Sequence, residues 1–418
     1  MDNNELFASG NFGLERETLR VNNSGRLART KHPFDDPSVT RDFCENQIEI
    51  VTGVCPSVRK VVKELERLDG KVRAKLNAMG ESLWMYSNPP RITTEAEIPV
   101  AQFSGEAREK TTYREYLQSR YGKRLMLYSG VHFNFSFTDE YLDTISDRAD
   151  LEEFKKDFYL RLYKQVCMHS WLLLLLTASS PVYDKSLDAD GEKGAVRSPY
   201  SSMRSSDRGY WNSFVPVIDC TSLDSFVNSI QSYVDSGKLI SPSELYLPVR
   251  LKPKGTNDLE GLSKSVSHIE LRMFDLDPTR PLGVNENDLE FAHLLLMYLS
   301  RQPDFDFTPQ LQRQAVKNHK NAALCSLIGV EVDGVGIIKK AAQIIDGMKW
   351  FFSYDKQAME LLEYERRKLY HRPCMQIRTK DIYNTKKEGD NNVRASRIFR
   401  KKLHRYTHTA AGVLLSLR

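Results

Sequence analysis

Five segments of the sequence alternate polar and apolar side chains, and this pattern constrains the fold more than any other feature. They read GLERETLRV (13–21), DFCENQIEIV (42–51), YSGVHFNFSF (128–137), ELYLPVRLK (244–252) and HIELRMF (268–274). Successive side chains of a β-strand point to opposite faces of its sheet. Each segment therefore predicts a strand with one polar and one apolar face, as in an antiparallel sheet that is covered on one side.

Helical patterns lie between and after these segments. Apolar residues recur at helical spacing over 57–76, 151–176 and 289–299, and again within 337–370. Helices and strands in mixed order indicate an α+β fold with one continuous core. No internal repeat or low-complexity linker divides the 418 residues, so we expect a single domain over 1–418, with a mainly helical portion from about 301 to 418.

The composition fits a globular protein and argues against a dedicated nucleic-acid binder. Hydrophobic residues make up 40% of the chain and charged residues 28%. The 60 lysines and arginines against 55 acidic residues give a net charge of only +5, which is small for a chain of this size. We interpret the basic stretch 394–405 as a solvated helix face and expect no nucleic-acid partner.

The sequence gives no sign of export or membrane insertion. The opening residues, MDNNELFASG, lack a basic start followed by an apolar core, and the longest apolar run is WLLLLL at 171–176. A membrane span requires about 20 apolar residues. The six cysteines form no CxxC pair, so neither a zinc knuckle nor a redox dithiol is indicated. We expect a cytoplasmic protein with reduced thiols and no membrane partner.

The polar faces of the five expected strands carry residue types that bind metals and anions. The sets are Glu15 and Glu17; Glu45, Gln47 and Glu49; Gly130, His132, Asn134 and Ser136; Glu244, Tyr246, Arg250 and Lys252; and His268, Glu270 and Arg272. One alternative is a half-solvated sheet whose polar face meets only water. Such a face collects lysine, threonine and serine, whereas these strands carry few flexible lysines.

If these strands share one sheet, at least four carboxylates converge on one surface. They then repel each other by on the order of several kcal/mol unless cations are present. Carboxylate oxygens with one imidazole suit Mg²⁺ or Mn²⁺ better than zinc, and the interspersed Arg250, Lys252 and Arg272 are suited to phosphate oxygens. This combination indicates phosphoryl transfer. No GxxxxGK[ST] loop occurs, so we expect the sheet itself to hold a nucleotide.

The same segments resemble those of a known family. FGLERETLRV, RDFCENQIEIVTGV, LWMYSNPP, YSGVHFNFSF, SSMRSSDRGYWN, ELYLPVRLKPK and HIELRMFDLDPTRPLGV follow the order and spacing of bacterial-type glutamate–cysteine ligases (γ-glutamylcysteine synthetases). The resemblance covers roughly residues 12 to 300, and later residues resemble the family only in outline. It implies a curved antiparallel sheet that forms a funnel with helices outside, similar to the catalytic domain of glutamine synthetase.

The resemblance also implies roles for individual residues. It implies five metal ligands, namely Glu15, Glu17, Glu45, His132 and Glu270. Arg114 and Arg272 resemble catalytic contacts to the nucleotide phosphates, and Arg204 resembles the residue that holds the α-carboxylate of glutamate. The implied substrate-binding residues further include Tyr113, Leu117, Tyr210 and Tyr246 around cysteine, and Gly130.

The implied reaction joins the γ-carboxylate of glutamate to the α-amine of cysteine through a γ-glutamyl phosphate, while ATP is cleaved in the presence of Mg²⁺ or Mn²⁺. It is the first step of glutathione biosynthesis. The expected partners are the small molecules L-glutamate, L-cysteine and ATP, and we expect the chain to act as a monomer. Because the sequence lacks the ATP-grasp domain of the bifunctional members, we do not expect it to make glutathione alone.

Two alternatives remain open at this point. Met126 stands where some family members carry a glutamine, six residues before the strand histidine, so the acceptor could be a different amino acid or amine. From another class, the basic stretch 394–405 would suit a nucleic-acid-binding protein with a degenerate enzyme fold. That alternative predicts salt-sensitive binding to RNA or DNA and no magnesium-dependent ATP turnover. The carboxylates and the histidine of the polar faces argue against it.

Overall fold

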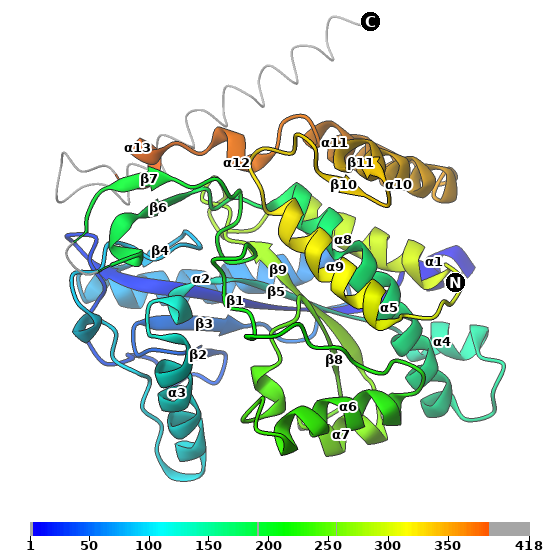
Figure 1. Cartoon of the computed structure of the whole chain (residues 1–418), viewed down its shortest axis with the longest axis horizontal. Helices are drawn as coiled ribbons and strands as arrows, with labels where there is room; N and C mark the ends of the chain where they lie inside the picture. Colours follow the sequence, from blue (N-terminus) through cyan, green and yellow to red (C-terminus); the bar gives the residue numbers. More distant parts are fainter. Residues whose placement is uncertain (1–2, 190–191, 256, 384–418) are drawn as a thin grey trace, which may run out of the picture.

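The computed structural model describes residues 3–189, 192–255 and 257–383, and a seven-stranded antiparallel sheet lies at its centre (Figure 1). The strands are β1 (Gly10–Asn22), β2 (Val39–Arg41), β3 (Gln47–Val51), β4 (Glu81–Trp84), β5 (Gly130–Phe137), β8 (Val249–Lys252) and β9 (His268–Asp275). Their order is β2-β3-β1-β5-β9-β8, and β4 pairs with the end of β1. The long strand β1 therefore has three neighbours.

Helices and two small hairpins surround this sheet. The helices are α1 (Asn3–Ala8), α2 (Val58–Ala78), α3 (Arg108–Tyr121), α4 (Asp139–Ile145), α5 (Leu151–Thr177), α6 (Leu223–Asp235), α7 (Leu259–Lys264), α8 (Glu286–Ser300), α9 (Pro309–Ala322), α10 (Ile337–Phe351), α11 (Lys356–Lys368), α12 (Pro373–Gln376) and α13 (Thr379–Ile382). The hairpins pair β6 (Val182–Asp184) with β7 (Ala195–Arg197), and β10 (Glu331–Val332) with β11 (Val335–Gly336). The α+β class predicted from the sequence is confirmed.

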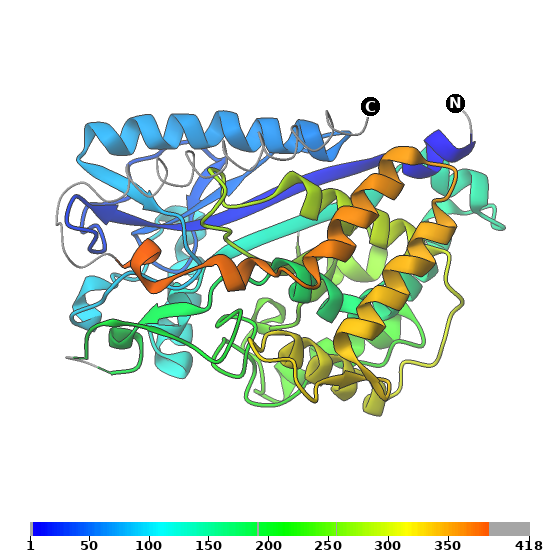
Figure 2. The ribbon, with the colours of Figure 1, turned by 90° about the horizontal axis from the view of Figure 1, so that it is seen from above.

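The apolar face of the sheet packs against α2, α5 and α8. Leu14, Phe133 and Leu271 from three neighbouring strands are buried there in one cluster with Leu65 of α2 and Leu172 of α5. Figure 2 shows α2 running alongside β1. Burial of apolar surface on this side is the main stabilising contribution to the sheet. It also fixes which side chains of each strand face the other way.

A buried ion pair confirms the facing of β1. Arg16 lies on the helix side of the strand, where its Nη2 is 2.6 Å from Oδ1 of Asp69 on α2. Because neighbouring residues of a strand alternate, Glu15 and Glu17 point to the opposite side. The two faces predicted from GLERETLRV are thus both present in the structure.

The predicted helices are confirmed, and their ends follow local sequence signals. The stretch 57–76 corresponds to α2, whose N-cap Ser57 accepts a hydrogen bond from the Lys60 N–H. The stretch 151–176 corresponds to α5, which begins after Asp150. The stretch 337–370 contains two helices, α10 and α11, where one helical stretch was expected.

Two predicted strands begin later than expected. Residues 44–46 form a turn, closed by a 3.0 Å hydrogen bond from the Gln47 N–H to the Cys44 carbonyl, so β3 begins only at Gln47. In the other segment, Pro242–Glu244 forms a 3₁₀ turn and β8 begins at Val249, after Pro248. Proline has no N–H to donate to a sheet ladder, which explains a strand that begins only after it.

The described C-terminal residues are mainly helical and pack against the central helices. Helix α9 contacts α5, and α10 and α11 contact α8. Their buried residues Ala315, Ile337 and Ile345 belong to the same apolar cluster as the sheet. The basic stretch 394–405 lies outside the described residues. None of the described helices has the length and apolar character that crossing a bilayer requires.

Candidate active site

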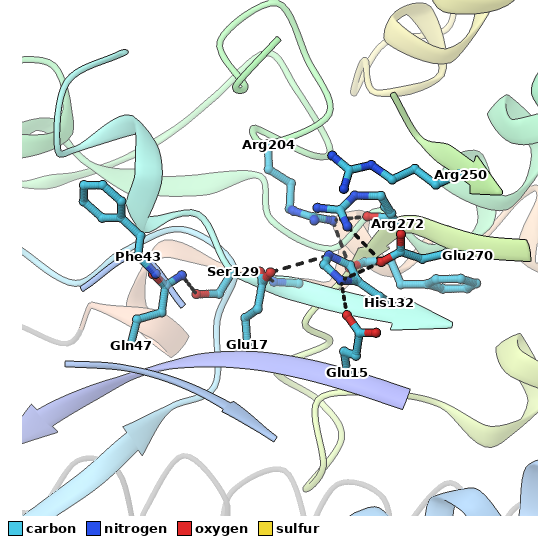
Figure 3. Close-up of polar contacts among 12 residues, drawn as sticks. Glu15, Glu17, Phe43, Gln47, Ser129, His132, Arg204, Arg250, Glu270 and Arg272 are labelled. Atoms are coloured by element: carbon cyan, nitrogen blue, oxygen red, sulfur yellow. Dashed lines mark hydrogen bonds and ion pairs between the residues drawn. The ribbon is translucent and has the colours of Figure 1, made fainter. Parts of the chain in front are cut away.

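The polar face of the sheet gathers four glutamates around one histidine. Figure 3 shows three of them, Glu15, Glu17 and Glu270, directed toward His132. Glu15 and Glu17 lie on β1, Glu49 on β3, His132 on β5 and Glu270 on β9. The antiparallel register places Glu17 opposite Glu49 and Glu15 opposite His132. We call these five residues the carboxylate cluster. Four strands contribute to it, so it depends on the sheet being assembled.

His132 lies at the centre of the carboxylate cluster. Its Nδ1 is 3.1 Å from Oε2 of Glu15 and 3.4 Å from Oε1 of Glu270, and its Nε2 is 3.5 Å from Oε1 of Glu17. Glu17 also accepts a 3.0 Å hydrogen bond from the backbone N–H of Gly130. These contacts keep the three acidic side chains close together around the imidazole.

Burial and crowding raise the pKa of two members of the carboxylate cluster. Burial raises the pKa of Glu17 above its ordinary value. Burial, together with repulsion from Asp42 and Glu15, raises the pKa of Glu49 well above its ordinary value. Both shifts mean that this face disfavours a full set of negative charges when no cation is present.

Strands β8 and β9 also contribute cationic side chains, which lie close to Glu270. Arg272 Nη1 is 2.8 Å from Oε1 of Glu270, and Lys252 Nζ is 3.4 Å from its Oε2. Burial opposes ionisation of Glu270, but attraction to Arg272 and Lys252 outweighs it and lowers the pKa of this carboxyl. Burial lowers the pKa of Arg250, and the nearby charge of Arg272 lowers it further. Arg250, Lys252 and Arg272 share Glu270 as a nearby carboxylate. A further negative group beside them, such as a phosphate, would balance their positive charge.

The carboxylate cluster has the donors that a hard divalent ion requires. Within it, Glu15, His132 and Glu270 form one group and Glu17, Glu49 and His132 another, each with ligand atoms within 4.8 Å of one another. His132 Nε2 and Glu270 Oε2 are buried without a hydrogen bond among the described residues. Carboxylate oxygens suit Mg²⁺ or Mn²⁺. The residues present therefore fit such an ion, whose charge would also offset their mutual repulsion.

The structure places Glu45 outside the carboxylate cluster. Glu45 lies in the turn before β3, and its Oε1 accepts hydrogen bonds from Arg41 Nη1 at 3.0 Å and from the Gln102 N–H at 2.8 Å. The expectation that Glu45 continues the polar face of the β3 strand is wrong, because Glu45 lies before Gln47, the first strand residue.

Glu49, a member of the carboxylate cluster, and its neighbour Asp42 were not predicted as ligands from the sequence. Glu49 lies on the polar face of β3, where alternation had placed it, and belongs to one of the ligand groups. Asp42 lies close enough to raise the pKa of both Glu17 and Glu49. The alternating pattern predicts that Glu49 lies on the polar face. No sequence pattern indicates a role for Asp42, which precedes the turn.

Arg204 is held over the start of β5. Its Nη1 donates hydrogen bonds to the carbonyl oxygens of Arg272 (2.9 Å) and Phe274 (3.1 Å). The guanidinium lies against the backbone of Gly130, where a Cβ atom would be only 2.4 Å from Arg204 Cζ. Gly130 thus leaves the space that Arg204 occupies, which links two residues implied as substrate contacts.

The expected tyrosines lie together beside Arg204. The rings of Tyr210 and Tyr246 are 5.1 Å apart, and Tyr113 lies close enough to Tyr246 to raise its pKa. Burial raises the pKa values of Tyr113 and Tyr246, so both phenols stay neutral. Leu117 and Met126 are buried in the same apolar cluster.

A cavity lies between two arginines and two of these tyrosines. Arg204, Arg272, Tyr210 and Tyr246 line it, and we call it the arginine–tyrosine cavity. His319 of α9 also lines it, although sequence patterns had given this residue no role.

Arg114 lies at the rim of the carboxylate cluster. Its Nε donates to the backbone carbonyl of Asp42, and its Nη1 donates to the Lys110 carbonyl at 2.9 Å. Its guanidinium lies 4.8 Å from the centre of the Phe103 ring, with Arg41 at 4.3 Å from the same ring. It is placed beside Asp42, and its described contacts do not include Arg272.

Comparison with known proteins identifies the family. The family model described as glutamate-cysteine ligase matches residues 1–240 and 234–322. The chain belongs to the glutamate–cysteine ligase family. A glutamate–cysteine ligase of Clostridium acetobutylicum is 31% identical over 374 residues, which cover 76% of this chain and 77% of that protein. The family resemblance seen in the sequence motifs is therefore confirmed.

Other relatives are longer than this chain. A bifunctional glutathione biosynthesis protein of Listeria monocytogenes is 35% identical over 401 residues, which cover 88% of this chain and 51% of that protein. The chain spans about half the length of the bifunctional relatives that it matches.

Two solved structures share the fold. The glutamate–cysteine ligase of Francisella tularensis, solved in complex with AMP, matches with a TM-score of 0.80 and 23% identity, covering 94% of this chain and 89% of that chain. A bifunctional glutathione synthetase of Pasteurella multocida matches with a TM-score of 0.79 and 24% identity, covering 95% of this chain and 53% of that chain.

Proposed function

We propose that this protein catalyses the ATP-dependent ligation of the glutamate γ-carboxylate to the α-amine of cysteine, through a γ-glutamyl phosphate. The observation that carries the proposal is the carboxylate cluster, which faces Arg272 and adjoins the arginine–tyrosine cavity in a member of this family. ATP as co-substrate is also supported by the relative from Francisella tularensis that was solved with AMP.

Phosphorylation solves the chemical difficulty of the reaction. A carboxylate does not react with amines at neutral pH, because oxide would have to leave. Transfer of the γ-phosphoryl group of ATP to the carboxylate creates an acyl phosphate, from which phosphate leaves when the amine attacks. Because ATP and glutamate are both anionic, the site must supply positive charge to bring them together.

The residues of the site divide this work. Glu15, Glu17, Glu49, His132 and Glu270 would hold divalent ions. Bound Mg²⁺ or Mn²⁺ supplies charge that neutralises the phosphates and polarises the transferred group. Arg272, which pairs with Glu270, would stabilise charge on the transferred phosphoryl group, and Arg114 at the rim would be a further phosphate contact. Arg204 binds the α-carboxylate of glutamate.

The proposed acceptor is cysteine, bound beside Tyr113, Tyr210 and Tyr246. These phenols and the buried Leu117 belong to one apolar cluster, and such surroundings suit a thiol side chain. Met126 favours a second candidate, a γ-glutamyl ligase for another amino acid or amine, because a buried thioether in the same cluster offers only a weak hydrogen-bond acceptor.

An acceptor panel separates the two candidates. Purified protein with ATP, Mg²⁺ and L-glutamate is given cysteine, other α-amino acids or simple amines, and phosphate release is measured together with the ligated product. Cysteine should give the highest kcat/KM. A higher kcat/KM for another acceptor would favour the second candidate. Absence of glutamate-dependent phosphate release with every acceptor would contradict the proposed function.

A further inference from the structure

A buried histidine from the C-terminal helices lines the arginine–tyrosine cavity, and no step proposed above uses it. His319 lies on α9, is only 1% exposed and borders the cavity together with Arg204 and Trp211. The Trp211 ring contacts it edge-on, with ring centres 5.9 Å apart. The cavity is thus completed by a helix far along the chain from the strands that carry the carboxylate cluster.

The hydrogen bonds of His319 define its tautomer. Its Nδ1 is 3.0 Å from Oγ of Ser170 on α5. The single hydroxyl proton of Ser170 is donated to the Cys167 carbonyl, 3.1 Å away. Ser170 Oγ therefore accepts from His319, whose Nδ1 carries the proton. The other ring nitrogen, Nε2, keeps a free lone pair.

This imidazole is neutral in the folded protein. Burial, and then the positive charges of Arg204 and Lys320, lower the pKa of His319 to about 3. A base with so low a pKa holds no proton near neutral pH, which argues against a role in accepting a proton from the acceptor amine. What His319 offers the cavity is a hydrogen-bond acceptor.

The charged groups that line the cavity can only donate hydrogen bonds. Arg204 and Arg272 are guanidinium groups, which suit the carboxylate and phosphate oxygens of the substrates. Glutamate also carries an α-ammonium group, one carbon away from the α-carboxylate that Arg204 would hold. A buried ammonium needs an acceptor, because leaving it without a partner costs binding free energy.

We propose that His319 accepts a hydrogen bond from the α-ammonium group of glutamate bound at Arg204. In this way His319 selects an α-amino acid over a dicarboxylate of the same length that lacks the amine. The inference rests on the proposed function, because it assigns the cavity to glutamate. Ser170 acts as the positioning residue that keeps the lone pair on Nε2.

Two polar substitutions with different reach test this role. In H319N the side-chain amide can replace Nδ1–H toward Ser170 but reaches no further, whereas in H319Q an amide oxygen can reach the position of Nε2. The KM values for L-glutamate and cysteine are measured for each, together with the inhibition constant of glutarate, which is glutamate without its amine. The melting temperature of each variant reports folding.

H319N should raise the KM for glutamate about 10- to 100-fold, the range for a buried group that loses its partner, and change the inhibition constant of glutarate less than about threefold. H319Q should stay within about threefold of the wild type for both. Equal changes for glutamate and glutarate, or a change only in the KM for cysteine, would overturn the inference.

Failure of the proposed function would look different, because the wild type itself would then show no glutamate-dependent ATP cleavage. In that case the affinities of wild type, H319N and H319Q for L-glutamate and glutarate are measured by calorimetry, which needs no turnover. Preference for glutamate in the wild type and H319Q but not in H319N would support the inference. The same preference in all three, or in none, would overturn it.

Discussion

Replacing Gly130 by alanine tests how the proposed glutamate site is positioned. In the structure, a Cβ atom at residue 130 would lie 2.4 Å from Arg204 Cζ and 2.6 Å from each of its Nη atoms. Ordinary contacts of this kind are 3.4–4 Å long, so the guanidinium must move by about 1 Å. Such a move breaks the alignment of Arg204 with the carbonyl groups of Arg272 and Phe274.

The expected cost falls on glutamate binding. A hydrogen bond to a charged group contributes about 1.5–3 kcal/mol, which corresponds to about a 10- to 150-fold rise in the KM for glutamate. The fold itself should tolerate the change, because Gly130 lies in β5 and does not have a left-handed backbone conformation. The KM for ATP should change far less, because Arg204 is proposed to contact only glutamate.

The assay is phosphate release at varied glutamate with ATP and cysteine in excess. G13A serves as the matched control, because Gly13 lies in the neighbouring strand β1 and a Cβ there would meet only the Asn134 Cβ atom, at an ordinary 3.5 Å. G13A should behave like the wild type. A KM for glutamate within twofold of the wild type in G130A would refute the assignment of Arg204 to this substrate.

Further substitutions test the carboxylate cluster, the buried ion pair and one titrating group. E49Q and E270Q should each lower kcat by more than about 100-fold, because each removes a charge proposed to hold a divalent ion. In the absence of metal, E49Q should melt no lower than the wild type, because the raised pKa of Glu49 means that the folded protein disfavours its negative charge. A clear loss of melting temperature in E49Q would contradict this. Asp69→Ala should lower the free energy of unfolding by about 3–5 kcal/mol in a denaturant titration, because it leaves the buried Arg16 without its ion-pair partner. A loss below about 1 kcal/mol would argue against the Arg16–Asp69 ion pair. Burial raises the pKa of Glu365 from 4.5 to about 8, so its contribution to stability is complete below pH 4.5 and is lost as the pH rises through 8. The melting temperature of the wild type should therefore fall more between pH 5 and pH 8 than that of E365Q, and parallel curves would contradict the shift.

The sequence predicted the polar face of the sheet wherever alternation was long and unbroken. GLERETLRV and GVHFNFSF correspond to β1 and β5, and they place Glu15, Glu17 and His132 on one face. These strands pack an apolar face against helices, so a shift of register by one residue would bury the charges. The pattern therefore records the facing of each side chain reliably.

The pattern was less reliable where a turn interrupts the strand. Glu45 and Glu49 are four residues apart, so period-two alternation places both on one face, yet the turn at residues 44–46 directs Glu45 toward Arg41 and the Gln102 N–H. The hydrogen bonds of the turn determine that Glu49, and not Glu45, lies on the polar face, and the periodicity of the sequence does not reveal these bonds.

Contacts between distant segments were beyond any local pattern. His319 enters the arginine–tyrosine cavity only because α9 packs against α5, and no spacing in the sequence relates residue 319 to Arg204. The space that Gly130 leaves for Arg204 is likewise visible only once the loop carrying Arg204 is placed over β5. The family resemblance predicted a role for Arg204, but only the fold shows that the carbonyl oxygens of Arg272 and Phe274 position its guanidinium.

The most direct test of the proposed reaction follows oxygen atoms. L-Glutamate labelled with ¹⁸O in both γ-carboxylate oxygens is incubated with the protein, ATP, Mg²⁺ and cysteine, and the released phosphate is analysed by mass spectrometry. If a γ-glutamyl phosphate forms, each phosphate should carry one ¹⁸O atom, and the product amide should keep the other. Unlabelled phosphate accompanying γ-glutamylcysteine would contradict the acyl phosphate mechanism.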